Sequence, residues 1–378
     1  MSLPADFFAE FSPVSKAQWL ERIAKDLKGK PLDELYWQLN EDIRIDPFGH
    51  PDDQPNPPQP LTEAPANWVI NEDVQEADPR AANRQALEAL AFGAEGLCFS
   101  VSQLEHLPAL LEGIYLDYIE LFFCGKAVET APAAFLNAVA EAARRQGIAL
   151  DRLRGALLYD PATTTADWRY LGELMRYAQT DFPGYRTLSV QSDMPYEEPA
   201  QAVQNLVHLL RRGNEYLRVG AERGIDPALT ASQMLFRIQV GKSYYVEIAR
   251  LRAFRLLWLN VLNAWQLPLA YPVLDVRFAP AAYTDELYTN MVRATTMAMS
   301  AVLGGANILT VRPYDAGREH QAQYPQTFSR RIARNVQHLL KLESGFAELA
   351  DPAAGSYFLE KLTIQFAGTA WKHFTTSG

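Results

Sequence analysis

Three ionisable residues stand just beyond short apolar runs of the sequence: Asp160, Asp193 and Lys242. In α/β enzymes the loops that follow strands carry the reacting side chains, so these groups could form a general acid–base set. A structural interpretation is stronger, because charged residues at loop edges commonly cap helices or face solvent. Asp160-Pro161 is typical of a turn, and Glu197-Glu198 is typical of the first turn of a helix.

The sequence lacks the common motifs for a serine nucleophile, a phosphate-binding loop and a zinc site. It contains no GxSxG, GxxxxGK[ST] or HExxH pattern, and Gly304-Gly305 precedes a predicted strand rather than a helix, so no phosphate-binding loop is predicted there. The six histidines are scattered, and Cys98 and Cys124 form no CxxC pair, so no zinc site is predicted. Each cysteine lies within a predicted strand, where we expect a buried thiol in a reducing compartment.

The elements that would position these residues alternate between strand and helix. The stretch 155–190 has the pattern strand, helix, strand, which predicts a βαβ unit with parallel strands. Eight strands are predicted along the chain, at 96–101, 118–124, 157–159, 188–190, 234–240, 273–278, 308–311 and 346–349. Their count and order predict an α/β fold of the (β/α)8 TIM-barrel type rather than an open doubly wound sheet.

Two parts of the chain differ in composition. Residues 1–66 are predicted to form an extended N-terminal arm with a proline-rich linker, and residues 67–378 are predicted to form the barrel. Large apolar side chains of the arm are our expected docking surface: Phe7, Phe8, Trp19 and Trp37. On the predicted helix 242–265, Arg252 and Arg255 are expected to form surface ion pairs and to pack with their stems.

The composition is that of an ordinary globular protein of 378 residues, with a formal net charge of −10. That charge disfavours nucleic acid and anionic membranes as partners. No apolar run approaches the roughly eighteen residues that a membrane helix requires, and the N-terminus lacks the pattern of a secretory signal. We therefore expect a cytoplasmic protein.

Three long stretches resemble the barrel domain of the cobalamin-dependent methylmalonyl-CoA mutase family: VEIARLRAFRLLW (246–258), FSRRIARNVQHLLKLESG (328–345) and DPAAGSYFLEKLT (351–363). The stretches YTNMVRATTMAM (288–299) and SPVSKAQWLERIAKDLKGKP (12–31) are also similar to the family. Together they cover nearly the whole chain in the family's order. The resemblance implies a (β/α)8 barrel with an N-terminal arm that wraps a partner subunit.

The family's substrate-binding positions are changed in this chain. By the resemblance, Asp73 stands where active members carry a tyrosine, Leu158 where they carry a glutamine, and Met194 where they carry a histidine, while a further arginine has no counterpart. A carboxylate at position 73 is predicted to repel an anionic substrate, and Leu158 and Met194 cannot donate hydrogen bonds to a carbonyl. We therefore expect a barrel mouth without the donors and positive charge that an acyl-CoA requires, and no catalytic, cofactor-binding or metal-binding residue.

The DxHxxG loop, whose histidine ligates cobalt in the family, is absent from the sequence, so no cobalamin-binding domain is expected in this chain. The resemblance implies the non-catalytic small subunit of a heterodimeric mutase. Its arm and barrel would pair with a large subunit that holds adenosylcobalamin and interconverts methylmalonyl-CoA and succinyl-CoA.

Two alternatives stay open. The first is a catalytic barrel that takes adenosylcobalamin from a separate domain or chain. It requires a tunnel along the axis and polar groups at strand ends, for which Arg277, Gln239 and Arg312 are the candidates. The second alternative is an unrelated barrel enzyme that uses Asp160 and Lys242.

Overall fold

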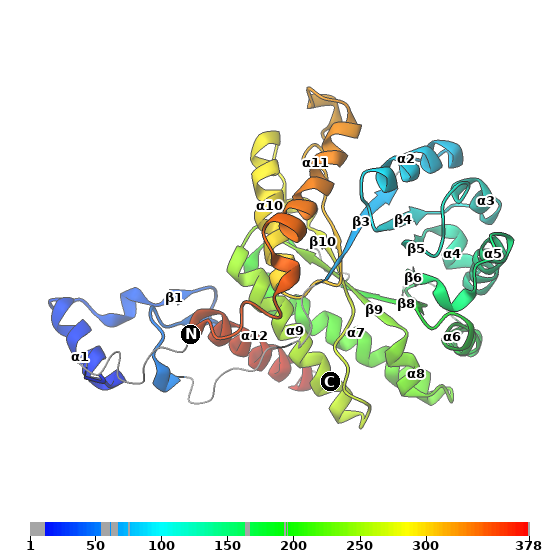
Figure 1. Cartoon of the computed structure of the whole chain (residues 1–378). Helices are drawn as coiled ribbons and strands as arrows, with labels where there is room; N and C mark the ends of the chain where they lie inside the picture. Colours follow the sequence, from blue (N-terminus) through cyan, green and yellow to red (C-terminus); the bar gives the residue numbers. More distant parts are fainter. Residues whose placement is uncertain are drawn as a thin grey trace.

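The strands close into a barrel in the computed structural model, which describes residues 12–53, 61, 67–74, 76–162, 167–192, 194 and 196–376. Nine strand segments form one parallel sheet in the order β7-β6-β5-β4-β3-β11-β10-β9-β8. β7 and β8 are halves of one strand, separated at Thr187, because β7 pairs with β6 and β8 pairs with β9. The sheet therefore closes with eight strand positions, and the predicted (β/α)8 barrel is confirmed (Figure 1).

The helices surround the strands (Figure 1). The barrel strands are β3 (Val69–Val74), β4 (Gly96–Ser100), β5 (Glu120–Cys124), β6 (Arg154–Leu157), β7 (Tyr185–Arg186), β8 (Leu188–Gln191), β9 (Met234–Val240), β10 (Leu274–Phe278) and β11 (Ile308–Thr310). The longer helices are α2 (Pro79–Ala91), α5 (Pro132–Arg145), α6 (Trp168–Asp181), α7 (Ala202–Glu222), α9 (Tyr244–Ala264), α10 (Leu287–Leu303), α11 (Gln326–His338) and α12 (Tyr357–Thr376). The short helices are α3 (Leu107–Leu110), α4 (Lys126–Thr130) and α8 (Pro227–Ser232). None of the helices in the described ranges is long and apolar enough to cross a membrane.

The first barrel strand, β3, lies within the predicted barrel domain but was not predicted as a strand, since the first predicted strand began at residue 96. Its sequence is VINEDV, and its polar residues interrupt the apolar pattern by which a buried strand is predicted. Asn71 donates to Thr310 of β11 at 2.8 Å and Asp73 pairs with Arg277 of β10, so both side chains face the barrel interior. Polar residues therefore interrupt both faces of β3, with Asn71 and Asp73 beside Val69 on the inner face and Glu72 between Ile70 and Val74 on the outer face.

The predicted eighth strand, 346–349, is wrong. Phe346–Glu348 forms a 3-10 turn that follows Gly345, whose φ of 65° is left-handed. A run of four residues, three of them apolar, is too short to distinguish a strand from a turn. The other seven predicted strands are present near their predicted places.

The βαβ unit formed by β6, α6 and β7/β8 is parallel, as predicted. α6 buries one face, formed by Leu171, Leu174, Met175 and Ala178. In β6, at the start of the unit, Gly155 has φ of 138°, and a Cβ atom there would lie 1.9 Å from the carbonyl oxygen of Leu121. Only glycine can bring β6 so close to β5 at this point.

Two apolar cores stabilise the barrel. The larger one lies between the strands and the helices. The smaller one lies inside the barrel and is called the inner cluster below; it consists of Cys98, Phe122, Ala156, Leu158, Leu235 and Ile308. All six side chains are buried, so the inner cluster fills this part of the axis.

Helix α9 is buried on nearly all sides, which corrects the predicted surface roles of its arginines. Arg252 is 2% exposed and Arg255 is 7% exposed. Arg252 pairs with Asp351 and, at 2.8 Å, with Glu360 of α12, and Arg255 donates to the carbonyl oxygen of Gly305 at 2.9 Å. The physical reason is that α12 packs on α9 and turns a face that is polar in sequence into an internal contact.

The arm extends to one side of the barrel and contacts α12 (Figure 1). It contains α1 (Lys16–Asp26), the 3-10 turns η1 (Leu32–Leu35) and η2 (Pro51–Asp53), and a hairpin of β1 (Trp37–Gln38) and β2 (Arg44–Ile45). Ile43 and Ile45 are buried, and the side chain of Gln365 on α12 bonds both backbone groups of Arg44, at 3.0 and 2.6 Å. The hairpin is therefore bound to α12 by apolar burial and by backbone hydrogen bonds.

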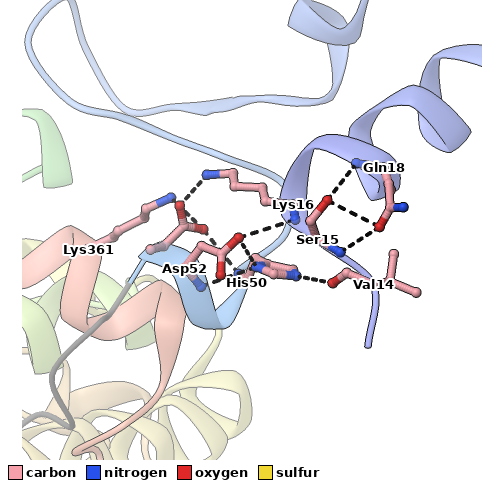
Figure 2. Close-up of polar contacts among 8 residues, drawn as sticks. Val14, Ser15, Lys16, Gln18, His50, Asp52 and Lys361 are labelled. Carbon is pink, nitrogen blue, oxygen red and sulfur yellow. Dashed lines mark hydrogen bonds and ion pairs between the residues drawn. The ribbon is translucent and has the colours of Figure 1, made fainter. Parts of the chain in front are cut away.

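Ion pairs extend this contact to α1. Lys361 of α12 lies 3.6 Å from a carboxylate oxygen of Asp53, which also pairs with Lys16 of α1. Figure 2 shows Lys16 beside Lys361, together with the backbone bond from Lys16 to Asp52 at 3.2 Å. Of the predicted docking residues, Trp19 is half-buried and Trp37 is 38% exposed, while Phe7 and Phe8 lie outside the described residues.

Candidate functional site

Two cavities adjoin at the carboxyl ends of the barrel strands, a region called the mouth below. The first cavity has a volume of about 200 Å³ and lies between β3, β10, β11 and α11. The second, also of about 200 Å³, is lined by residues that include Met194 and Arg237. Gln239 and Arg277 line both cavities and form the boundary between them.

A chain of ion pairs crosses the mouth. Arg277 donates from Nη1 to both oxygens of Asp73 at 2.7 Å and from Nε to Asp275 at 3.1 Å, and Arg237 donates to Asp275 at 3.0 Å. Asp275 is only 1% exposed. Burial by itself raises the pKa of Asp275, but Arg277 and Arg237 together hold it below its ordinary value. The carboxylate is therefore ionised, and the four side chains form one neutral network.

A second set of charges comes from α11. Arg334 pairs with Glu72 on β3, and Arg330 lies 3.6 Å from Glu72 and 3.6 Å from Glu88. Burial raises the pKa of Glu72 despite the opposing effect of Arg334. Together with Arg312, these side chains concentrate positive charge around the first cavity.

The structure brings the three changed family positions to one region. Asp73 lines the first cavity, Met194 lines the second cavity, and Leu158 packs in the inner cluster. The predicted loss of positive charge is wrong, because arginines surround the mouth. The predicted repulsion by Asp73 is also reduced, because Arg277 neutralises its carboxylate.

The candidate residues for a catalytic barrel lie together in the structure. Arg277, Gln239 and Arg312 all line the first cavity. No wide tunnel accompanies them among the described residues, because the inner cluster and the ion pairs occupy the axis. Each cavity is smaller than the roughly 300–1,000 Å³ of typical small-molecule sites.

Of the three residues that could form an acid–base set, the structure describes Asp160 and Lys242, and neither is among the residues that line the two cavities. Asp160 is buried and accepts hydrogen bonds from Tyr216 and, at 3.0 Å, from the backbone of Ala162. Tyr216 belongs to α7, so Asp160 joins a strand end to an outer helix, which agrees with its structural interpretation. Lys242 is exposed after β9, and Asp193 lies outside the described residues. Glu198 is the N-cap of the 3-10 turn η5 (Pro199–Gln201), as its sequence pattern indicates.

The two thiols lie together inside the barrel. Cys98 is buried, Cys124 is half-buried, and both are free. A hydrogen bond between them is the largest influence on both groups: it raises the pKa of Cys98 and lowers the pKa of Cys124 to about 7. Burial raises both values, and Arg277 lowers both. Cys124 is therefore expected to ionise more readily than an ordinary thiol, and in its protonated form it donates to the carbonyl oxygen of Phe99 at 3.6 Å.

Donors suited to a metal ion are not gathered in the described part of the chain, where no three His, Cys, Asp or Glu side chains are grouped for ligation. No histidine is among the described residues that line the two cavities.

Several residues of the mouth were not recognised from the sequence: Arg237, Asp275, Arg330 and Arg334. A usable signal exists for three of them, Asp275, Arg330 and Arg334. Asp275 and Arg277 alternate along a buried strand, which places both on one face, and Arg330 and Arg334 are four apart on a helix. Polar residues on the inner face of a barrel strand are costly unless they are paired, so they mark an internal network.

Fold and site together define the class: a closed parallel (β/α)8 barrel with an N-terminal arm and an ion-paired mouth. Residues 83–376 match the family model described as methylmalonyl-CoA mutase. The chain therefore belongs to the methylmalonyl-CoA mutase family.

Its relatives include both kinds of mutase subunit. It is 31% identical to the "Methylmalonyl-CoA mutase small subunit" of Porphyromonas gingivalis, with 97% of this chain and 63% of that protein covered. It is 32% identical to the small subunit of Streptomyces virginiae, with 83% and 52% covered, and 28% identical to the large subunit of the same organism, with 72% and 38% covered. The chain thus spans less than two thirds of the length of each of these relatives.

Proposed function

We propose that this chain is the non-catalytic subunit of a heterodimeric methylmalonyl-CoA mutase and that it supports assembly of the complex. The observation that carries the proposal is the occupied barrel interior. Leu158 packs in the inner cluster, Arg277 is bound to Asp73 and Asp275, and each cavity of the mouth measures about 200 Å³. A CoA thioester is larger than the ligands of typical small-molecule pockets and exceeds this space.

The partner in this proposal is a large mutase subunit that holds adenosylcobalamin. Two relatives are named small subunits, and one of their organisms also has a large subunit similar to this chain.

The arm is the proposed contact with that partner. It extends from α12 to one side of the barrel (Figure 1). Among its described residues, Leu35 is 39% exposed, Trp37 is 38% exposed and Phe48 is 49% exposed. Apolar side chains exposed on one extended segment are typical of a protein–protein contact.

The competing proposal is a catalytic barrel that receives adenosylcobalamin from elsewhere. One observation favours it: Arg277, Gln239 and Arg312 line a common cavity, as that function would require. The ion pairs of Arg277 and the volume of the cavity count against it.

Titration calorimetry separates the two proposals. The isolated chain is titrated with methylmalonyl-CoA and with adenosylcobalamin, and succinyl-CoA formation is assayed with and without the large subunit. We expect no binding of either compound to the isolated chain, no turnover without the large subunit, and a stable complex of the two chains. Binding of both compounds, or turnover by this chain alone, would refute the non-catalytic assignment.

A further inference from the structure

The first cavity carries an excess of positive charge in an otherwise acidic protein. Two carboxylates, Glu72 and Asp73, face four lining arginines: Arg277, Arg312, Arg330 and Arg334. Arg277 is balanced within its network with Arg237, Asp73 and Asp275, whereas among the described residues Arg312, Arg330 and Arg334 face only Glu72 and Glu88. The remaining excess of positive charge contrasts with the net charge of −10 of the whole chain. Positive charges concentrated in a cavity attract anions selectively.

Some donors of these arginines have no acceptor. Arg334 is 3% exposed and pairs with Glu72 through Nη1, while its Nε and Nη2 have no hydrogen-bond partner among the described residues. Arg312 donates from Nη2 to the carbonyl oxygen of Ala316 at 3.3 Å, and its buried Nε also lacks a described partner. Buried donors without acceptors are unfavourable, so an added acceptor would stabilise this arrangement.

Arg330 is held only loosely. Its distances to Glu72 and Glu88, both 3.6 Å, are too long for hydrogen bonds. Its guanidinium can therefore turn toward a ligand in the cavity without breaking a hydrogen bond to either carboxylate.

We propose that the first cavity binds a compact oxyanion, of which inorganic phosphate is the simplest example. Guanidinium groups match the oxygens of phosphate and carboxylate in pairs, and such an anion would supply acceptors near the unpartnered donors of Arg312 and Arg334. A volume of about 200 Å³ admits a small anion and excludes a nucleotide-sized one. The anion site goes beyond the proposed function, since a subunit without mutase activity can still bind an anion.

Titration calorimetry of the full chain in phosphate-free buffer, at constant chloride concentration, tests the site. One titration uses inorganic phosphate, and a second titration uses succinate as a small dicarboxylate. We expect saturable binding of at least one of them with one site per chain. The compound that binds shows whether the cavity takes a phosphate or a dicarboxylate.

Two variants make the test specific. Arg312→Gln removes a cavity cation and is expected to weaken binding about tenfold, as for the loss of one charge-assisted contact. Arg331→Gln makes the same charge change one residue from Arg330, but Arg331 is exposed, stacks 5.3 Å from the ring centre of Phe328 and does not line the cavity. Binding to Arg331→Gln is expected to stay within a factor of about two.

Two outcomes would overturn the anion site. One is the absence of saturable binding of both anions by the native chain. The other is an equal loss of affinity in Arg312→Gln and Arg331→Gln, which would indicate diffuse attraction to the surface. Should Arg312→Gln lose its native circular dichroism spectrum, Arg330→Gln replaces it. Neither overturning outcome bears on mutase turnover or on complex formation, so the subunit proposal is tested separately.

Discussion

Arg277 of β10 binds both carboxylate oxygens of Asp73 on β3 at 2.7 Å, although β11 lies between these two strands. The pair therefore spans a neighbouring strand at the mouth of the barrel. The resemblance predicts that Asp73 stands at the position of a substrate-binding tyrosine of active family members. In this chain the Asp73 side chain is held in an internal ion pair.

Arg277→Met is expected to reduce the free energy of unfolding by about 3 kcal/mol, because it leaves the buried Asp275 with one cation and Asp73 with none. Urea denaturation followed by circular dichroism measures this change. Asp73→Asn is the control, and we expect a smaller loss because Arg277 keeps its pair with Asp275. A loss below about 1 kcal/mol for Arg277→Met would show that the ion-pair network contributes little to stability.

Cys124 is expected to react with iodoacetamide at a rate that rises through a pH of about 7, since its pKa is lowered to about 7. The thiolate is the reacting form, so the rate increases as the pH rises past that value. Cys98 should stay unmodified in the folded chain, because it is buried and its pKa is raised. Mass spectrometry of the labelled peptides distinguishes the two sites.

Cys98→Ala removes the hydrogen bond that most lowers the pKa of Cys124. The midpoint of Cys124 labelling should then move up toward about 8.5, the value of an unperturbed thiol. An unchanged midpoint in Cys98→Ala, or faster labelling of Cys98 than of Cys124, is incompatible with this thiol arrangement.

Arg252→Leu is expected to lower the free energy of unfolding by about 3–5 kcal/mol, because Asp351 and Glu360 lose their buried partner. The matched control is Arg218→Leu on α7, whose two ion pairs with Glu215 and Glu222 are solvent-exposed. The control should leave the urea midpoint unchanged. Equal midpoint shifts in the two variants would contradict the internal role of Arg252.

Ile45→Asp is expected to release the arm hairpin from α12, because it places a charge where the native side chain is 1% exposed. Limited proteolysis should then cut within residues 12–53 at least about tenfold faster, while the barrel stays intact. Leu35→Asp is the control within the arm, since Leu35 is 39% exposed. Protease resistance equal to that of the native arm would mean that the hairpin is held by other contacts.

The barrel could be predicted from the sequence because most of its strands are apolar runs between helices of clear periodicity. The helix of the predicted βαβ unit, α6, for example, buries Leu171, Leu174, Met175 and Ala178, which recur at helical spacing. β3 was missed because the barrel interior around it is polar, so Asn71 and Asp73 interrupt its apolar pattern. A strand that contributes to an internal ion-pair network does not show the hydrophobic signal of a core strand.

The candidate site was only partly predictable, for a related reason. Sequence spacing shows that Arg252 and Arg330 lie on helices, but not which helix face another element covers. α12 buries Arg252, and β3 supplies Glu72 to Arg330 from a distant part of the chain. The pairing of Asp73 with Arg277 likewise depends on barrel closure, which joins residues 204 positions apart.

The number of CoA thioester sites in the complex of this chain with the large subunit tests the central claim most directly. Equilibrium dialysis of the purified complex with a non-reacting analogue of methylmalonyl-CoA gives that number. We predict one site for each pair of chains, located in the large subunit. Two sites for each pair would contradict the assignment of this barrel as non-catalytic.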